Sequence, residues 1–80
     1  MNLEKTLLRG KLAERKQRLQ ELRIKADGLI VSLRLILDPY ADLLELENLE
    51  AGLGQMEELV ELWREAVKLS EEIKKMEKDL

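Results

Sequence analysis

The side chains that could carry chemistry in this chain are hydroxyls and carboxylates, because its 80 residues include no His and no Cys. Imidazole and thiolate groups are the usual ligands of zinc, haem and iron–sulfur clusters and the usual partners in nucleophilic catalysis. The hydroxyls belong to Thr6, Ser32, Tyr40 and Ser70, and none stands in a motif that would activate it. We therefore expect no catalytic residue, no metal site and no cofactor.

Adjacent carboxylates occur twice, at Glu57–Glu58 and at Glu71–Glu72. Neighbouring residues on a helix point about 100° apart, so neither pair converges on one point. Acid–base catalysis also needs a cleft that shifts a carboxyl pKa, and a short helical chain has little room for one. Solvated helix faces explain these carboxylates more simply, and we expect that the protein is not an enzyme.

The composition is that of long helices and coiled coils, with 45% hydrophobic and 39% charged residues and only one Pro. Eighty residues allow one small domain. The most apolar stretch, residues 29–37, contains Ser32 and Arg34 and is far shorter than the ~20 residues of a bilayer span. The first residues carry charge where a secretory signal needs an apolar run. We expect a cytoplasmic protein without a membrane partner.

Helical periodicity predicts one helix over about 2–37 and another over about 48–79, separated by a bend over 38–47. Asn2 is a suitable N-cap for the first helix. Pro39 ends that helix, because proline forces the residue before it into extended geometry.

The start of the second helix has two readings. Asn48 is a good N-cap and favours a start there. Gly52 and Gly54 weaken the first turns, so a start near Gln55 is the alternative.

Apolar residues recur with alternating spacings of three and four on both helices, which is the signature of coiled-coil packing. In heptad notation (abcdefg) the seam is formed by positions a and d. Position a holds Leu12, Leu19, Ala26 and Leu33 in the first helix, and Leu59, Ala66, Ile73 and Leu80 in the second. Position d holds Leu8, Arg15, Leu22, Leu29 and Ile36, and then Leu62, Leu69 and Met76. The sequence thus predicts an all-α, antiparallel helical hairpin.

Flanking charges fix the expected pairing, because antiparallel coiled coils bring g positions together. The predicted pairs are Lys25 with Glu58, Arg18 with Glu65, and Lys11 with Glu72. The midpoint of each pair falls between residues 41 and 42, inside the bend. The same register sets Leu29 opposite Gly52 and Arg15 opposite Ala66, and shifts of seven residues remain open because the charges repeat every heptad.

Both helices carry more apolar surface than one seam can cover, and so short a chain rarely builds a sufficient core alone. We expect the hairpins to self-associate near the bend, as a dimer or tetramer, with a four-helix bundle as the simplest form. The expected interface residues are Leu29, Ile30, Val31, Leu33, Ile36, Leu37, Met56, Val60, Trp63 and Val67. Trp63 is the expected anchor, and its packing within one hairpin is equally open.

Three cations at e positions of the first helix, Arg9, Lys16 and Arg23, face no acidic partner in this register. They could contact a phosphate backbone, or the stem of Lys16 could lie over Trp63. The chain is acidic, with a pI near 5.0, and lacks stacking aromatics for single strands. Direct nucleic-acid binding is therefore not expected but stays an alternative.

The stretch from Gly28 to Leu43 contains the pattern SLR-x-hydrophobic-LDP-aromatic between two charged arms. About 16 residues in this form resemble small helical proteins of Mu-like prophages of proteobacteria, which are mostly uncharacterised. The resemblance implies a bacterial cytoplasm and a phage context, and it brings no catalytic residue or ligand.

The sequence therefore predicts a non-enzymatic structural or interaction module that self-associates through apolar helix faces near the bend. Two alternatives stay open. One is a nucleic-acid-associated accessory protein of a prophage, and the other is a subunit that docks a different protein through its apolar tip.

Overall fold

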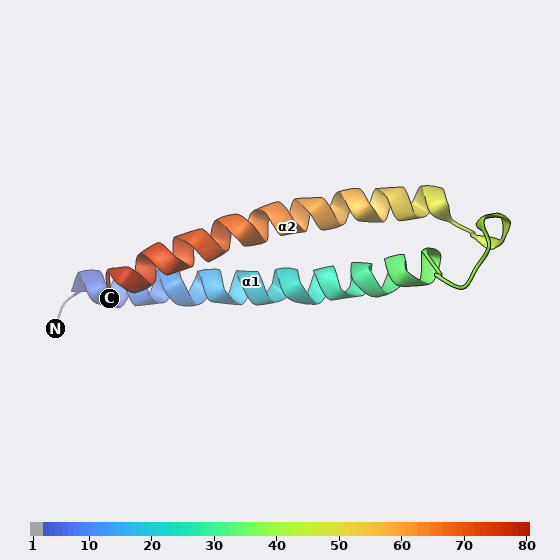
Figure 1. Ribbon diagram of the computed structural model, residues 1–80. Coiled ribbons are helices and arrows are strands. Elements are labelled where there is room, and N and C mark those ends of the chain that lie inside the picture. The colour runs from blue at the N-terminus through green and yellow to red at the C-terminus, as the bar shows by residue number, and fades with distance from the viewer. Residues whose placement is uncertain (1–2) are drawn as a thin grey trace.

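The computed structural model describes residues 3–80 and consists of two long helices joined by a bend (Figure 1). Helix α1 spans Leu3–Ile36 and helix α2 spans Leu49–Lys78, and one turn of 3-10 helix, η1, spans Leu43–Glu45 in the bend. The helices lie side by side and antiparallel, so the end of α2 returns to the beginning of α1. The predicted all-α antiparallel hairpin is thus confirmed. Asn2, the expected cap of the first helix, lies outside the described residues.

The bend begins where the Asp38–Pro39 pair stops α1. The last α-type hydrogen bond runs from the Leu37 N–H to the Leu33 carbonyl at 2.8 Å. Asp38 then accepts a hydrogen bond from the Tyr40 N–H through Oδ1 at 2.9 Å, which closes a local turn. Proline cannot continue the helical ladder, so the chain leaves the axis of α1 here.

Helix α2 begins directly after Asn48, one residue later than the predicted bound, and the alternative start near Gln55 is wrong. Asn48 has φ 60° and ψ 26°, the left-handed region, and its side chain makes no capping hydrogen bond. Its carbonyl accepts the N–H of Gly52 at 2.9 Å. The expected side-chain cap is therefore corrected: Asn suits this position because it tolerates a positive φ.

The hairpin is a thin rod of 65 × 18 × 15 Å whose radius of gyration, 18.3 Å, far exceeds the ~12 Å expected of a compact chain of this length. Its core is correspondingly small. Leu22 is 1% exposed and Ile73 is 8% exposed, and no other apolar side chain in residues 3–80 is buried except at the glycine of Gly52. Within this part of the chain, neither helix has an apolar stretch long enough to cross a membrane.

Candidate interaction surface

The two sides of the hairpin seam differ in chemistry. On one side, which we call the charged side, Arg18 of α1 donates two hydrogen bonds to Glu65 of α2, from Nε to Oε1 at 3.0 Å and from Nη2 to Oε2 at 3.1 Å. These hydrogen bonds, with the charge attraction, lower the pKa of Glu65 and raise the pKa of Arg18. This pair is the predicted one, so the structure selects the predicted register over shifts of seven residues.

The other two predicted pairs do not form. Glu72 is bonded to Arg15, whose Nε lies 2.9 Å from Oε2, and not to Lys11. Arg15 occupies a d position, so its charged group must leave the apolar seam, and a long arginine stem lets it reach the flanking carboxylate. Lys25 and Glu58 form no ion pair within the described part of the chain.

Gly52 also lies elsewhere than predicted. An added Cβ at Gly52 would lie 3.2 Å from Ile36 Cγ2 and 3.8 Å from Leu33 Cδ2, and so Gly52 faces these residues and not Leu29. An a-position residue packs between two residues of the facing seam. The absent side chain here lets α2 approach the last turn of α1.

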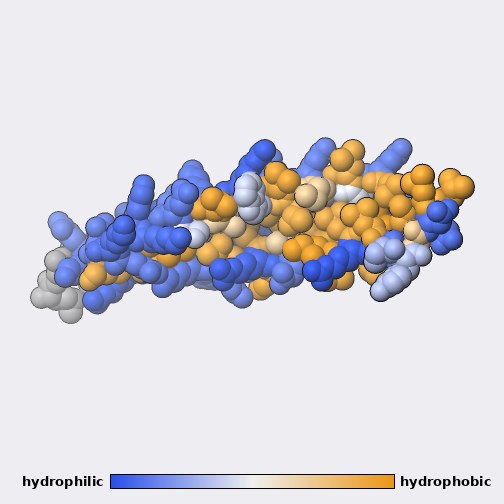
Figure 2. All heavy atoms as spheres, in the orientation of Figure 1, coloured by the Kyte–Doolittle hydropathy of each residue, from blue (hydrophilic) through white to orange (hydrophobic). Residues whose placement is uncertain are grey.

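The opposite side of the seam is apolar towards the bend. Helix α2 carries a second stripe with spacings of four and three, and α1 adds residues from its last turns. We define the apolar face as Ile30, Leu33, Leu37, Leu49, Leu53, Met56, Val60, Trp63 and Val67. Leu53 is 64% exposed and Trp63 is 62% exposed, so Trp63 does not belong to the hairpin core. In Figure 2, apolar side chains gather over the bend half of the visible surface and charged ones over the open end.

Three adjoining hollows make the apolar face uneven. One of about 500 Å³ is lined by Ile30, Leu33, Arg34, Leu37, Pro39 and Leu59. A second, of about 240 Å³, shares Leu33 and Leu37 with the first and extends to Leu53 and Met56. A third, of about 320 Å³, begins at those two residues and ends at Arg64. Because neighbouring hollows share residues, the surface is continuous from the bend to the middle of α2.

The predicted interface residues divide into two groups in the structure. Leu29, Leu33 and Ile36 are half-buried in the seam, and Leu33 and Ile36 contact Gly52 there. Val31 is 57% exposed at an f position, on the back of α1. The remaining predicted residues belong to the apolar face. Leu49 and Leu53 complete that face and were missing from the expected interface, although the three-and-four spacing up to Val67 would have identified them.

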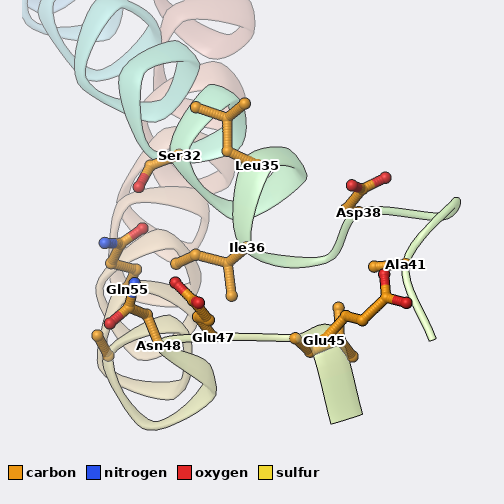
Figure 3. Close-up of a pocket in the computed structure, with 11 residues that line it drawn as sticks. Ser32, Leu35, Ile36, Asp38, Ala41, Glu45, Glu47, Asn48 and Gln55 are labelled. Carbon is orange, nitrogen blue, oxygen red and sulfur yellow. The ribbon is translucent and has the colours of Figure 1, made fainter. Parts of the chain in front are cut away.

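A separate pocket of about 400 Å³ lies inside the bend (Figure 3). Its lining includes Ser32 and Ile36 of α1, Gln55 of α2 and carboxylates from the bend. Gln55 Oε1 is buried there without a hydrogen-bond partner among residues 3–80. In Figure 3, Asp38 lies across the pocket from Gln55, so the acidic side chains do not converge. The described residues contain no cluster that could hold a metal ion.

The three cations expected to lack acidic partners are not equivalent. Lys16 Nζ lies 3.2 Å from Glu77 Oε1, so its expected lack of a partner is wrong. Its expected contact with Trp63 does not form either, because Glu77 lies 14 residues, or about 21 Å, further along α2. Within residues 3–80, Arg9 and Arg23 form no ion pair. The basic stripe is therefore reduced to two separated arginines.

Comparisons with known proteins add no family to this description. No protein-family model, no curated protein and no solved structure matches the chain. The resemblance to small prophage proteins consequently stays a prediction, and the function must be argued from the residues and geometry of this chain alone.

Proposed function

We propose that this chain is a non-enzymatic structural or interaction module, and that it works as a homodimer held together by the apolar face. The observation that carries the proposal is the size of the uncovered surface. The hairpin exposes 6706 Å², whereas a compact folded chain of 9.3 kDa exposes about 5,000 Å². The difference of about 1,700 Å² per chain is surface that folding alone leaves in water.

This area fits a stable dimer. Standard protein–protein interfaces bury about 800 Å² on each partner, and obligate homodimers bury more, with a more apolar centre. Two hairpins that cover their apolar faces give a four-helix bundle, a recurrent arrangement for packing helix pairs. A second copy also brings the same hollows and the same projecting leucines, as an isologous interface requires.

The bend itself supports a second candidate. Tyr40 is 94% exposed and Leu44 is 90% exposed, and both lie beyond the ends of the two helices. A different protein docking on this tip would cover them. Nucleic-acid association receives less support, because Lys16 is paired with Glu77 and Arg9 and Arg23 alone remain of the three candidate cations.

A matched pair of variants tests the proposal. Leu53→Glu places a charge in the apolar face, and Leu35→Glu places one on the side of the bend pocket. Both leucines are exposed in the hairpin, at 64% and 77%, so neither change removes a core side chain. In sedimentation velocity, Leu53→Glu should give helical monomers, and Leu35→Glu should remain dimeric. A Leu53→Glu protein as dimeric as the parent would refute the proposed interface, and a wild-type helical monomer would favour docking of another protein.

A further inference from the structure

Charge is distributed unevenly along the rod. All 14 Lys and Arg residues lie outside residues 35–63, which hold eight of the 17 acidic residues. These eight are Asp38, Asp42, Glu45, Glu47, Glu50, Glu57, Glu58 and Glu61. The hairpin therefore has a net charge of −8 around the bend and +5 over the rest, which together give the −3 of the whole chain.

Cations stand where the apolar face ends. Arg23 occupies the next e position of α1 after Ile30, one heptad further from the bend. Arg64 of α2 lines the outer hollow with Met56 and Val60, and its 67% exposed side chain reaches Glu61 only at 3.5 Å. Arg23 forms no ion pair in the part of the chain that the structure describes. Both arginines are thus available to a carboxylate from outside the hairpin.

We propose that the two copies pack their apolar faces antiparallel, so that the acidic bend of each copy lies over Arg23 and Arg64 of the other. This inference rests on the proposed dimer and specifies its orientation. The face from Leu49 to Val67 is about 27 Å long. Antiparallel overlap over this length places each bend at the far end of the partner's face, where the arginines stand. Parallel overlap would instead set two bends, each with eight carboxylates around it, against one another.

The overlap also predicts which cations matter. The two-fold axis passes near the middle of the stripe, between Met56 and Val60. Arg23 then lies within reach of the partner's bend. Arg9 is an e-position arginine of the same helix and equally free of ion pairs, but it lies about 21 Å further from the bend. Arg9 is therefore the matched control for Arg23.

Charge reversal tests this orientation. Arg23→Glu occurs twice in a two-fold dimer and replaces attraction by repulsion, so the dimer dissociation constant should rise about tenfold or more at low salt. Arg9→Glu should leave the constant within about twofold. Adding Asp42→Lys and Glu45→Lys to the Arg23→Glu chain should restore most of the affinity. Equal effects of the two arginine variants, or no restoration, would overturn the antiparallel overlap while leaving the dimer itself intact.

A distance measurement gives an independent readout. The chain has no cysteine, so Tyr40→Cys provides a single site for a spin label at an exposed position of the bend. In the antiparallel dimer the two labels should lie roughly 30 Å or more apart, given the length of the overlap. A separation well under 20 Å would indicate bends side by side and would contradict the inference. A wild-type chain that is monomeric would refute the proposed dimer, and the inference with it.

Discussion

Arg18 and Glu65 form a bidentate ion pair across the seam, with Nε to Oε1 at 3.0 Å and Nη2 to Oε2 at 3.1 Å. The pair joins a g position of α1 to a g position of α2, which is possible only when the helices run antiparallel. Two parallel hydrogen bonds also define the distance along the helices more narrowly than one point contact would. The pair therefore identifies the register of the hairpin.

Acid should weaken this pair. The hydrogen bonds from Arg18 lower the pKa of Glu65 in the folded chain, so the carboxylate stabilises the fold above the ordinary glutamate value of about 4.3. Its contribution is lost as the pH falls through the lowered value. Glu65→Gln should thus be less stable than wild type at pH 7, and the difference should shrink below about pH 4. Thermal unfolding followed by circular dichroism across pH 3–7 measures this difference.

A carboxylate elsewhere on α2 provides the control for that experiment. Glu71→Gln removes one negative charge without removing an ion pair of the described residues. Its stability at pH 7 should match that of the wild type. A Glu65→Gln protein that unfolds like Glu71→Gln at every pH would show that the Arg18 pair does not contribute to stability.

Gly52 and Gly54 should respond differently to the same substitution. A Cβ at Gly54 meets nothing within 4 Å, so Gly54→Ala should gain about 1 kcal/mol of helix stability. At Gly52 a Cβ would lie 3.2 Å from Ile36 Cγ2, so Gly52→Ala should gain less. Gly52→Leu should lower the free energy of unfolding by about 1–3 kcal/mol, whereas Gly54→Leu should not. Urea unfolding at one fixed protein concentration tests the four variants, and equal results at both glycines would contradict the close approach.

Gln55 should be replaceable with a gain in stability. Its Oε1 is buried without a hydrogen-bond partner among residues 3–80, and its d position faces the seam. A buried unsatisfied carbonyl costs about 1–3 kcal/mol, so Gln55→Leu should raise the free energy of unfolding by about 1 kcal/mol. Gln17→Leu, at an exposed position of α1, is the control and should change it little. A loss of stability in Gln55→Leu would mean that this side chain is satisfied in the assembled protein.

The sequence predicted the hairpin because three separate signals coincide. The seam spacing requires two packed helices, Pro39 requires a break, and the opposed charges of the g positions require an antiparallel return. Each signal depends on local geometry or on a repeat, and both can be read from residue order. The pairing of Arg18 with Glu65 followed from the same arithmetic.

Other contacts depend on side-chain reach, which residue order does not encode. Arg15 and Lys16 have flexible stems, and each meets a carboxylate about one helical turn or more from its expected neighbour. Asn48 adopts a left-handed backbone conformation where a side-chain cap was expected. Both conformations satisfy the same residue preference for this position, so the type of residue alone could not distinguish them.

The candidate surface was predicted in part. Apolar excess near the bend was visible in the composition of residues 29–37 and in the second stripe of α2. Composition could not separate Leu33 and Ile36, which the seam uses against Gly52, from Leu53, which is 64% exposed. That separation requires the rotation of each helix about its axis, which becomes known only when the two helices are packed.

The solution mass of the purified chain tests the central claim most directly. Light scattering coupled to size exclusion should be measured from low micromolar concentration upward, with circular dichroism to verify helicity. Self-association through the apolar face predicts twice the chain mass of 9.3 kDa throughout this range. A well-folded helical protein with the mass of a single chain at every concentration would contradict it.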